Sequence, residues 1–437
     1  MKEDNNLMEK LVSLCKQRGF IYQGSEIYGG LAGTWDYGPL GVALKNNIKN
    51  LWWKRFVLDR EDMYGFDAAI LMNQNVWKAS GHVGGFSDPL VECEKCKKRF
   101  RADHLDNKEK CPDCNGKLGE EKQFNMMFKT NVGAIQDENS ISYLRPETAQ
   151  GMFVNFKNVV DSFHPKLPFG LAQIGKAFRN EIAPRDFTFR TREFEQMEIE
   201  YFVKPENWET SFEEFRKEVH AYTNDIGLDE NKVHELEVGD GDRAHYSKRT
   251  IDFEFDYPFG KKELYGLAYR TDYDLGAHTK DSKVDLSFFE EESKSRFIPH
   301  VIEPSFGVDR TLLAVLTNAY TEDEMGGEKR VYLKFSPKVA PVKIAVFPLL
   351  KNKPELVEKA REIFKTLKSE FGNVVFDDNG NVGKRYRRQD EIGTPFCVTV
   401  DFDTIEKDNM VTVRDRDTGE QERVAVDNLQ NYFKAKF

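Results

Sequence analysis

The segment from Phe178 to Phe202 constrains the fold most, because it contains two predicted strands in which charged and apolar residues alternate. Alternate side chains of a strand lie on the same face, so Arg179 and Glu181 are predicted to point the same way on the first strand. On the second strand the polar face carries Phe194, Gln196, Glu198 and Glu200, and the other face carries Met197, Ile199 and Tyr201. The apolar face predicts packing on a core. The charged face must line a wet or charged site, because burying unpaired Arg and Glu is costly.

An exposed sheet with cross-strand Arg–Glu pairs is the simpler alternative for this segment. That alternative does not account for Phe194 among the charges. A nucleotide does, since Arg holds a phosphate, Phe stacks on a base and Glu accepts a hydrogen bond from an exocyclic amine. The two strands therefore favour a nucleotide site.

A second segment, Val301–Leu316, is predicted to be a strand running into a helix. Arg310 lies in the first helical turn, where the helix dipole disfavours a cation by a few tenths to about 1 kcal/mol. A polyphosphate bound there removes the penalty, because it pairs with both the Arg and the backbone amides. In the alternative reading, Asp309 satisfies the dipole and Arg310 is simply exposed.

Two Cys-x2-Cys pairs, Cys93/Cys96 and Cys111/Cys114, predict a zinc site with four thiolate ligands. Four sulfur ligands leave no open position, so the metal is expected to be structural. The alternative is a degenerate knuckle with partial or no metal. Basic residues around the first pair fit either contact with RNA or a solvated surface: Lys95, Lys97, Lys98, Arg99 and Arg101.

The 437 residues predict a mixed α/β (α+β) fold in two domains, residues 1–336 with an insertion at 91–123, and residues 337–437. Pro337–Pro341 resembles a linker, with a strand at Val342–Val346 and a helix from about Pro354 to Glu370 beyond it. Gly38-Pro39 is predicted to open an earlier helix. The net charge of −10 argues against a general nucleic-acid binder, but a basic group in the smaller domain could meet phosphates: Lys384, Arg385, Arg387 and Arg388.

The predicted cellular setting is cytoplasmic. The polar N-terminus does not suggest a signal peptide, and no apolar run approaches the ~18 residues of a membrane helix, so no membrane association is expected. Four of the six Cys are spaced for metal, which suits a reducing compartment.

These segments resemble the three signature motifs of class II aminoacyl-tRNA synthetases. Gly38-Pro39-Leu40 and its helix resemble motif 1, the dimer element; Phe178–Glu181 with Arg190 and Phe194 resemble motif 2; Gly307–Arg310 resembles motif 3. Longer strings resemble the homodimeric glycyl-tRNA synthetases over nearly the whole chain: Tyr143–Gly151, Glu193–Tyr201, Tyr269–Leu275 and Val301–Ser305.

The resemblance implies an antiparallel-sheet catalytic domain, a zinc-ribbon insertion, a C-terminal anticodon-binding domain and a homodimer. It implies ATP-dependent ligation of glycine to tRNA(Gly) through a glycyl-adenylate, with Mg²⁺ bound near Glu263 and Zn²⁺ as a structural ion. No protein nucleophile is needed, because catalysis is positioning and charge stabilisation. The absence of a convincing Ser-His-Asp or Cys-His set in the sequence fits such a reaction.

The resemblance also assigns residues. Arg179 and Arg310 are the implied catalytic groups. The implied ATP-binding residues are Arg179, Asn180, Glu181, Phe189, Arg190, Phe194, Glu263, Leu264, Gly307, Asp309 and Arg310. The implied glycine-binding residues are Arg101, Glu147, Gln196, Glu198, Glu303 and Ser305.

Selection of glycine must depend on excluding a side chain rather than fitting one. We expect Glu147, Glu198 and Glu303 to surround the ammonium group and to occupy the volume of a β-carbon. The main alternative is a non-catalytic nucleic-acid-binding accessory protein with a synthetase fold. It is disfavoured because Arg179, Arg190 and Arg310 are all present. A ligase for another amino acid is disfavoured by the resemblance alone, and an RNA-binding zinc ribbon with an unrelated catalytic half fits less well still.

Overall fold

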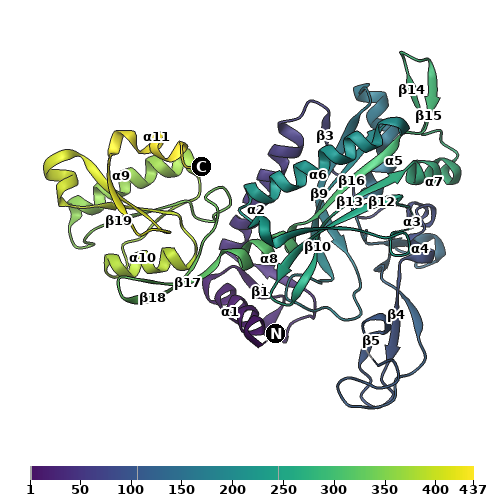
Figure 1. Ribbon diagram of the computed structural model, residues 1–437, viewed down its shortest axis with the longest axis horizontal. Helices are drawn as coiled ribbons and strands as arrows, with labels where there is room; N and C mark the ends of the chain where they lie inside the picture. Colours follow the sequence, from purple (N-terminus) through teal and green to yellow (C-terminus); the bar gives the residue numbers. More distant parts are fainter. Residues whose placement is uncertain (1, 106, 245) are drawn as a thin grey trace.

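The computed structural model describes residues 2–105, 107–244 and 246–437. A large N-terminal part and a smaller C-terminal part lie side by side (Figure 1). In these ranges no helix is both long enough and apolar enough to cross a membrane.

The N-terminal part is built on one sheet of seven strands in the order β11-β12-β13-β16-β10-β9-β3. All neighbouring pairs are antiparallel except β3 with β9. The bounds, in sheet order, are Val233–Glu237, Arg249–Tyr257, Gly260–Thr271, His300–Gly307, Glu193–Val203, Phe169–Phe178 and Met63–Gly65.

One face of this sheet is covered by three helices, α2 (Pro39–Trp53), α6 (Trp208–Asp225) and α8 (Val308–Ala319) (Figure 1). The predicted apolar face of β10 lies in this core, with Met197, Ile199 and Tyr201 almost fully buried. The predicted helix after Gly38 is confirmed, because α2 has Pro39 in its first turn, where the missing amide hydrogen would have had no partner.

Helices α5 (Ala149–Phe163) and α7 (Tyr273–Ser282) contribute to a second core, which packs against the other side of β9 and β10. Helix α1 (Lys2–Arg18) precedes a two-stranded sheet of β1 (Ile21–Gln23) and β2 (Trp35–Tyr37). Two short helices, α3 (Gln74–Ala79) and α4 (His82–Gly85), lead to the cysteine-bearing insertion.

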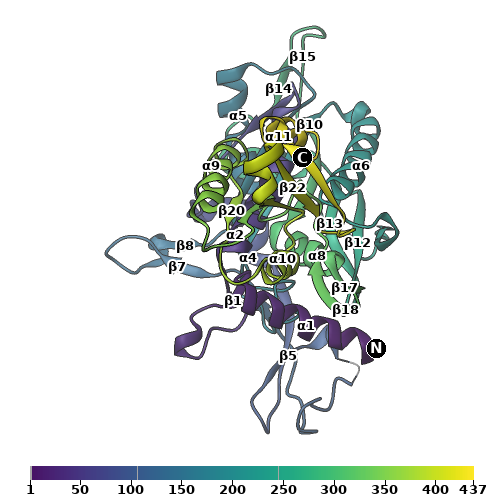
Figure 2. The same cartoon turned by 90° about the vertical axis from the view of Figure 1, so that its left-hand side faces the viewer.

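The insertion contains a three-stranded sheet of β4 (Ser87–Glu92), β5 (Arg99–Arg101) and β6 (Lys122–Asn125) that projects from the body. Three hairpins complete the N-terminal part. They pair β7 (Lys129–Asn131) with β8 (Ile141–Tyr143), β14 (Phe288–Glu290) with β15 (Ser295–Phe297), and β17 (Tyr320–Met325) with β18 (Glu328–Leu333). The β7–β8 hairpin forms an arm in Figure 2.

The C-terminal part has a five-stranded sheet in the order β20-β19-β21-β22-β23. Its strands are β19 (Ile344–Pro348), β20 (Val374–Phe376), β21 (Phe396–Val400), β22 (Met410–Asp415) and β23 (Gln421–Ala425), and its helices are α9 (Pro354–Phe371), α10 (Val382–Glu391) and α11 (Leu429–Lys434). The predicted helix from about Pro354 to Glu370 is confirmed by α9. The first strand begins two residues later than predicted, because pairing with β20 and β21 starts at Ile344.

The segment Pro337–Pro341, predicted to be a linker, contains no helix or strand, but it is anchored in the N-terminal part. Val339 and Ala340 are fully buried in the N-terminal core. The Asn47 side chain of α2 donates hydrogen bonds to the backbone oxygens of both residues, at 3.2 and 2.9 Å. The apolar pair between the prolines anchors this segment.

The basic group on α10 is largely occupied inside the protein. Arg385 is buried, and its guanidinium donates to the backbone oxygens of Pro348, Asp378 and Gly380. Arg388 pairs with Asp377 at 2.6 Å. Arg385 is therefore not available to a phosphate as predicted, because the turn before α10 has taken its donors.

Candidate active site

One cleft on the polar face of the central sheet brings together most of the predicted nucleotide residues. They come from the loop after β9, from β10, β13 and β16, and from the first turn of α8. The lining residues are Arg179, Glu181, Thr188, Phe189, Arg190, Thr191, Phe194, Gln196, Glu263, Leu264, Ser305, Gly307, Asp309 and Arg310. Asn180 adjoins the cleft without lining it, and its backbone N–H donates to Met126 O at 2.7 Å.

The prediction that Arg179 and Glu181 share a strand face is wrong, because β9 ends at Phe178. The Arg179 N–H still bonds Arg192 O at 2.9 Å, but the Asn180 N–H turns to Met126. The backbone thus leaves the sheet between these residues. Both side chains reach the cleft from a loop.

Arg179 contacts two aromatic rings, with its guanidinium carbon 5.3 Å from the ring centroids of both Phe86 and Phe194. Its Nε donates to Pro146 O at 3.1 Å. Cation–π contacts with two rings restrict the movement of the guanidinium. The remaining N–H groups are left to bind an anion.

The other two arginines of the cleft are paired with acidic residues. Arg310 contacts Glu263 at 3.0 Å and lies 4.4 Å from the centroid of the Phe189 ring. Arg190 contacts Glu181 at 3.4 Å. The Arg310 guanidinium lowers the pKa of Glu263, which favours the carboxylate form of that residue.

Asp309 has a structural environment rather than an open one. Its carboxylate accepts from the Glu195 N–H at 2.7 Å and from Lys45 of α2 at 3.2 Å, and Tyr37 also donates to it. These bonds fix the start of α8 against β10 and α2. Arg310, the next residue, is thereby aimed into the cleft.

Three of the predicted glycine-binding residues, Glu147, Glu198 and Glu303, lie buried behind the cleft rather than on its wall. Ser305 and Gln196 connect the two regions. The Ser305 hydroxyl donates to Glu198 Oε1 at 2.9 Å, and Gln196 Nε2 donates to the same oxygen at 3.4 Å. Carboxylates and a hydroxyl thus meet where the cleft ends.

Arg270 organises this buried cluster, although no sequence pattern pointed to a role for it. Its guanidinium pairs with Glu303 and with Asp274, the latter at 2.8 Å. Gln150 Nε2 then donates to Asp274 at 2.9 Å and to Glu147 at 3.0 Å. The only sequence signal for Arg270 was its place in the Tyr269–Leu275 string, as a lone cation near the end of an apolar strand.

The cluster contains more carboxyl groups than cations. Burial raises the pKa of Glu303 to about 8, although Arg270 opposes the shift and Glu198 adds to it. Burial and Glu147 raise the pKa of Glu198, and burial and Glu303 raise that of Glu200 well above its usual range. Both Glu200 oxygens are buried and accept no hydrogen bond. A cluster of this kind favours the binding of a small cation.

Arg101, the remaining residue predicted to bind glycine, lies outside the cleft. It ends β5 of the insertion and pairs with Asp88 at 2.6 Å and Asp103 at 2.7 Å. It lines a separate hollow beside Cys111. The structure therefore does not bring Arg101 together with the buried glutamates.

The four predicted metal ligands do come together. The Sγ atoms of Cys93, Cys96, Cys111 and Cys114 lie within 4.8 Å of one another. Hydrogen bonding from the backbone amide of Cys96 lowers the pKa of the Cys93 thiol to about 6, which favours the thiolate that a metal requires. A Cβ at Gly116 would lie 3.1 Å from Cys93 Sγ, so glycine lets the chain pass the cluster. The geometry is compatible with zinc.

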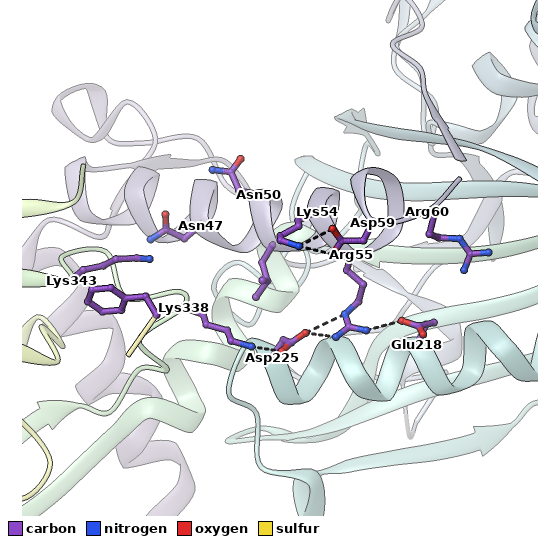
Figure 3. A pocket seen from close by; sticks show the side chains of 12 residues that line it. Asn47, Asn50, Lys54, Arg55, Asp59, Arg60, Glu218, Asp225, Lys338 and Lys343 are labelled. Carbon is purple, nitrogen blue, oxygen red and sulfur yellow. Dashed lines mark hydrogen bonds and ion pairs between the residues drawn. The ribbon is translucent and has the colours of Figure 1, made fainter. Parts of the chain in front are cut away.

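A larger cavity, of about 710 Å³, lies between α2, α6 and the C-terminal part. Figure 3 shows that several of its charged side chains pair with one another. Arg55 contacts Glu218 at 2.7 Å and also Asp225, and Lys338 contacts Asp225 at 2.5 Å. Size alone does not make this cavity the candidate site, because most of its cations are already paired with carboxylates.

The family comparisons agree with this geometry. The family model for the tRNA synthetase class II core domain (G, H, P, S and T) matches residues 128–319, which include most of the cleft and the glutamate cluster. The anticodon binding domain model matches residues 343–436. The fold and the site thus define a class II tRNA synthetase core with an anticodon-binding domain.

Full-length relatives show which family within this class the chain belongs to. Proteins named glycine--tRNA ligase from Thermobifida fusca and Clostridium acetobutylicum are 50% and 49% identical to this chain. Each alignment covers 99% of this chain and 98% or 99% of the relative. A third, from Lachnospira eligens, is 51% identical over 98% of this chain and 99% of the relative. The chain belongs to the glycine--tRNA ligase family.

Proposed function

We propose that this protein joins glycine to tRNA(Gly) in two steps, using ATP and forming a glycyl-adenylate. The single observation that carries the proposal is the continuity between the arginine-lined cleft and the buried glutamate cluster. Ser305 and Gln196 line the cleft and hydrogen-bond Glu198 of the cluster. A polyphosphate and a small cation bound in these two places would be adjacent, as attack of a glycine carboxylate on an α-phosphorus requires.

We assign the ATP half of the site as follows. Arg179 holds the α-phosphate and stabilises charge in the transition state, and Arg190 and Arg310 hold the terminal phosphates. Phe194 stacks on adenine, with Glu181 and Asn180 at its exocyclic amine. Glu263 is placed to bind Mg²⁺, an ion that takes oxygen ligands. Phe189, Leu264, Gly307 and Asp309 shape the cleft around the nucleotide.

Pairing of Arg310 with Glu263 supports these assignments. Arg310 pairs with the Glu263 carboxylate at 3.0 Å. A phosphate oxygen would compete with that carboxylate for Arg310. Release of the carboxylate would free an oxygen ligand at the polyphosphate. Glu181 stands in the same relation to Arg190.

The glycine half comprises Glu147, Glu198, Glu303, Ser305 and Gln196. Their carboxylates would surround the ammonium group, and their packing would leave no volume for a β-carbon. Arg101 belongs to this half only if the insertion moves, since Asp88 and Asp103 hold it in the structure. The exclusion is tested with Glu147→Ala. Rejection of alanine and serine at wild-type ratios would contradict it.

Zn²⁺ fits the four-cysteine cluster, where it would be held by Cys93, Cys96, Cys111 and Cys114 and would crosslink the insertion. Residues 337–437 would bind the anticodon, and residues 1–336 would carry the chemistry. The resemblance of Gly38-Pro39-Leu40 and its helix, α2, to the dimer element supports a homodimer through this helix. A cytoplasmic location follows from a function in protein synthesis.

The deciding experiment is amino-acid-dependent exchange of pyrophosphate into ATP, measured with each standard amino acid. Exchange with glycine alone is the expected result. Exchange with another amino acid would identify a different ligase. A complete lack of exchange would favour the accessory-protein alternative, which none of the described residues supports at present.

A further inference from the structure

A short glycine-rich segment, Ser80–Phe86, lies between the two halves of the candidate site. It contains α4 (His82–Gly85), entered through Gly81 with a left-handed φ of 86°. Neither of the two family models includes this segment, because they match residues 128–319 and 343–436. Its two ends contact residues assigned to different substrates.

His82 forms the glycine end of the segment. Its ring is buried, and His82 Nε2 lies 3.3 Å from Glu147 Oε2. Ser80 Oγ is 2.8 Å from His82 Nδ1, so the other ring nitrogen is also engaged. Trp77 packs its ring edge-on against the imidazole at 5.5 Å. The imidazole is thus held in one orientation, and it holds Glu147 in turn.

Phe86 forms the ATP end. The centroid of its ring lies 5.3 Å from the Arg179 guanidinium carbon, at the same distance as the centroid of Phe194. Its backbone oxygen accepts from the Met126 N–H at 3.0 Å, and Met126 O accepts from the Asn180 N–H at 2.7 Å. One residue of the segment thus contacts the Arg179 side chain and, through Met126, the backbone beside it.

Four bonds make the segment a compact unit. The Gly85 N–H donates to Gly81 O at 2.9 Å, and the Phe86 N–H donates to His82 O at 3.1 Å. Asn125 Nδ2 donates to the backbone oxygens of His82 and Val83, at 3.2 and 3.0 Å. The His82 and Phe86 rings also pack together at 5.4 Å. A displacement at one end is therefore transmitted to the other.

We propose that Ser80–Phe86 is a positioning element that couples glycine binding to ATP binding, with His82 acting through Glu147 and Phe86 acting through Arg179. The inference rests on the proposed function and deepens it. An ammonium group that fixes Glu147 fixes His82, and the segment then fixes Phe86 and the Arg179 guanidinium. Coupling between binding sites is reciprocal, so ATP bound at Arg179 strengthens glycine binding by the same factor.

The test is equilibrium binding of glycine to the full chain, with and without an ATP analogue that cannot transfer its α-phosphate. The ratio of the two glycine dissociation constants measures the coupling, which is expected to be about 5-fold or more in the wild type. Phe86→Leu keeps bulk but removes the ring, and should bring the ratio close to one. For His82→Leu the dissociation constant of the ATP analogue is measured with and without glycine, and the ratio of these two constants should also be close to one.

Phe86→Tyr is the matched variant, because it keeps the aromatic face and should retain the ratio. Thermal unfolding of each variant separates loss of coupling from loss of folding. A wild-type ratio of one, or an unchanged ratio in Phe86→Leu and His82→Leu, overturns the coupling. A wild type that binds neither ligand overturns the proposed function as well, whereas binding of both without coupling overturns only the positioning role.

Discussion

At the residue scale, the glutamate cluster shows how burial prepares a site for a cation. Glu147, Glu198, Glu200 and Glu303 are all buried near one guanidinium, that of Arg270. Burial disfavours the charged form of each carboxyl group. Neighbouring carboxylates add to this cost at Glu198, Glu200 and Glu303, whereas His82 and Arg270 outweigh burial and lower the pKa of Glu147. A bound ammonium group would relieve both effects.

This arrangement predicts that glycine binds more tightly as the pH rises towards 8. With a pKa of about 8, Glu303 is mostly protonated at pH 6. An ammonium group lowers that pKa, so binding at pH 6 releases up to one proton. The KM for glycine should therefore fall by at most about 10-fold per pH unit and level off above pH 8. Pyrophosphate exchange from pH 6 to 8.5 measures it.

The matched variant for this experiment is Glu303→Gln, which cannot release the proton. Its KM for glycine should be higher than that of the wild type but should vary less with pH. A wild-type KM that stays constant between pH 6 and 8 would contradict the assignment.

Arg179 offers a second prediction at this scale. Arg179→Ala removes the guanidinium that contacts Phe86 and Phe194. Loss of one preorganised charge-stabilising group costs about 100- to 1000-fold in rate. Single-turnover formation of glycyl-adenylate should show this loss. Arg296→Ala, which removes an exposed guanidinium on β15, controls for the change in charge.

At the element scale, the cysteine-bearing insertion is the part of the chain least able to fold by apolar packing. Its core is small, consisting of Val91, Ala102 and Leu118 around the cysteines themselves. Small cores of this size generally need a metal or another crosslink. The four thiols within 4.8 Å of one another supply the site for one.

We therefore predict that Cys96→Ser lowers zinc content and opens the insertion to proteolysis. Elemental analysis of the purified protein measures the metal, and limited digestion locates cleavage between residues 91 and 123. Cys397→Ser is the control, because Cys397 is a buried thiol in β21, away from the cluster. Equal metal content in both variants would exclude the four-cysteine site.

At the scale of the whole molecule, Arg330 joins the two parts of the chain. It lies on the β17–β18 hairpin, is almost fully buried, and pairs with Asp323 at 2.6 Å. It also reaches the C-terminal part, at Asp390 (3.2 Å) and the backbone oxygen of Arg416 (2.7 Å). Charge and hydrogen bonds therefore fix the smaller part against the larger one.

Arg330→Gln should lower the stability of this junction by about 1–3 kcal/mol, since Asp390 keeps Arg414 at 2.8 Å as a partner. Glycine-dependent pyrophosphate exchange should be retained, whereas charging of tRNA should fall. Calorimetry and the two activity assays measure these effects, with exposed Lys329→Gln as the control. Equal loss of both activities would show that the junction does not serve tRNA binding.

The sequence by itself determined the features that depend on local period and spacing. Alternation in β10 identified the apolar face that packs on the core, the Gly38-Pro39 pair marked the start of α2, and Cys-x2-Cys spacing identified the four thiols that meet. The motif resemblance also selected residues that share one cleft, with Arg179, Phe194 and Arg310 on its wall. Each of these patterns is made of short local segments, so it can be recognised in a single amino-acid sequence.

Only the tertiary structure decided which charged groups are free and which are already paired. Arg385 and Arg101 carry the same guanidinium as Arg179, yet turn carbonyls hold the first and Asp88 and Asp103 hold the second. The contacts of Arg270 and His82 with the buried glutamates form only in the folded structure, where β13 and α4 lie beside those glutamates. Their partners lie 33 and 65 positions away in the sequence, and contacts over such separations are set by packing of the whole sheet rather than by any local pattern.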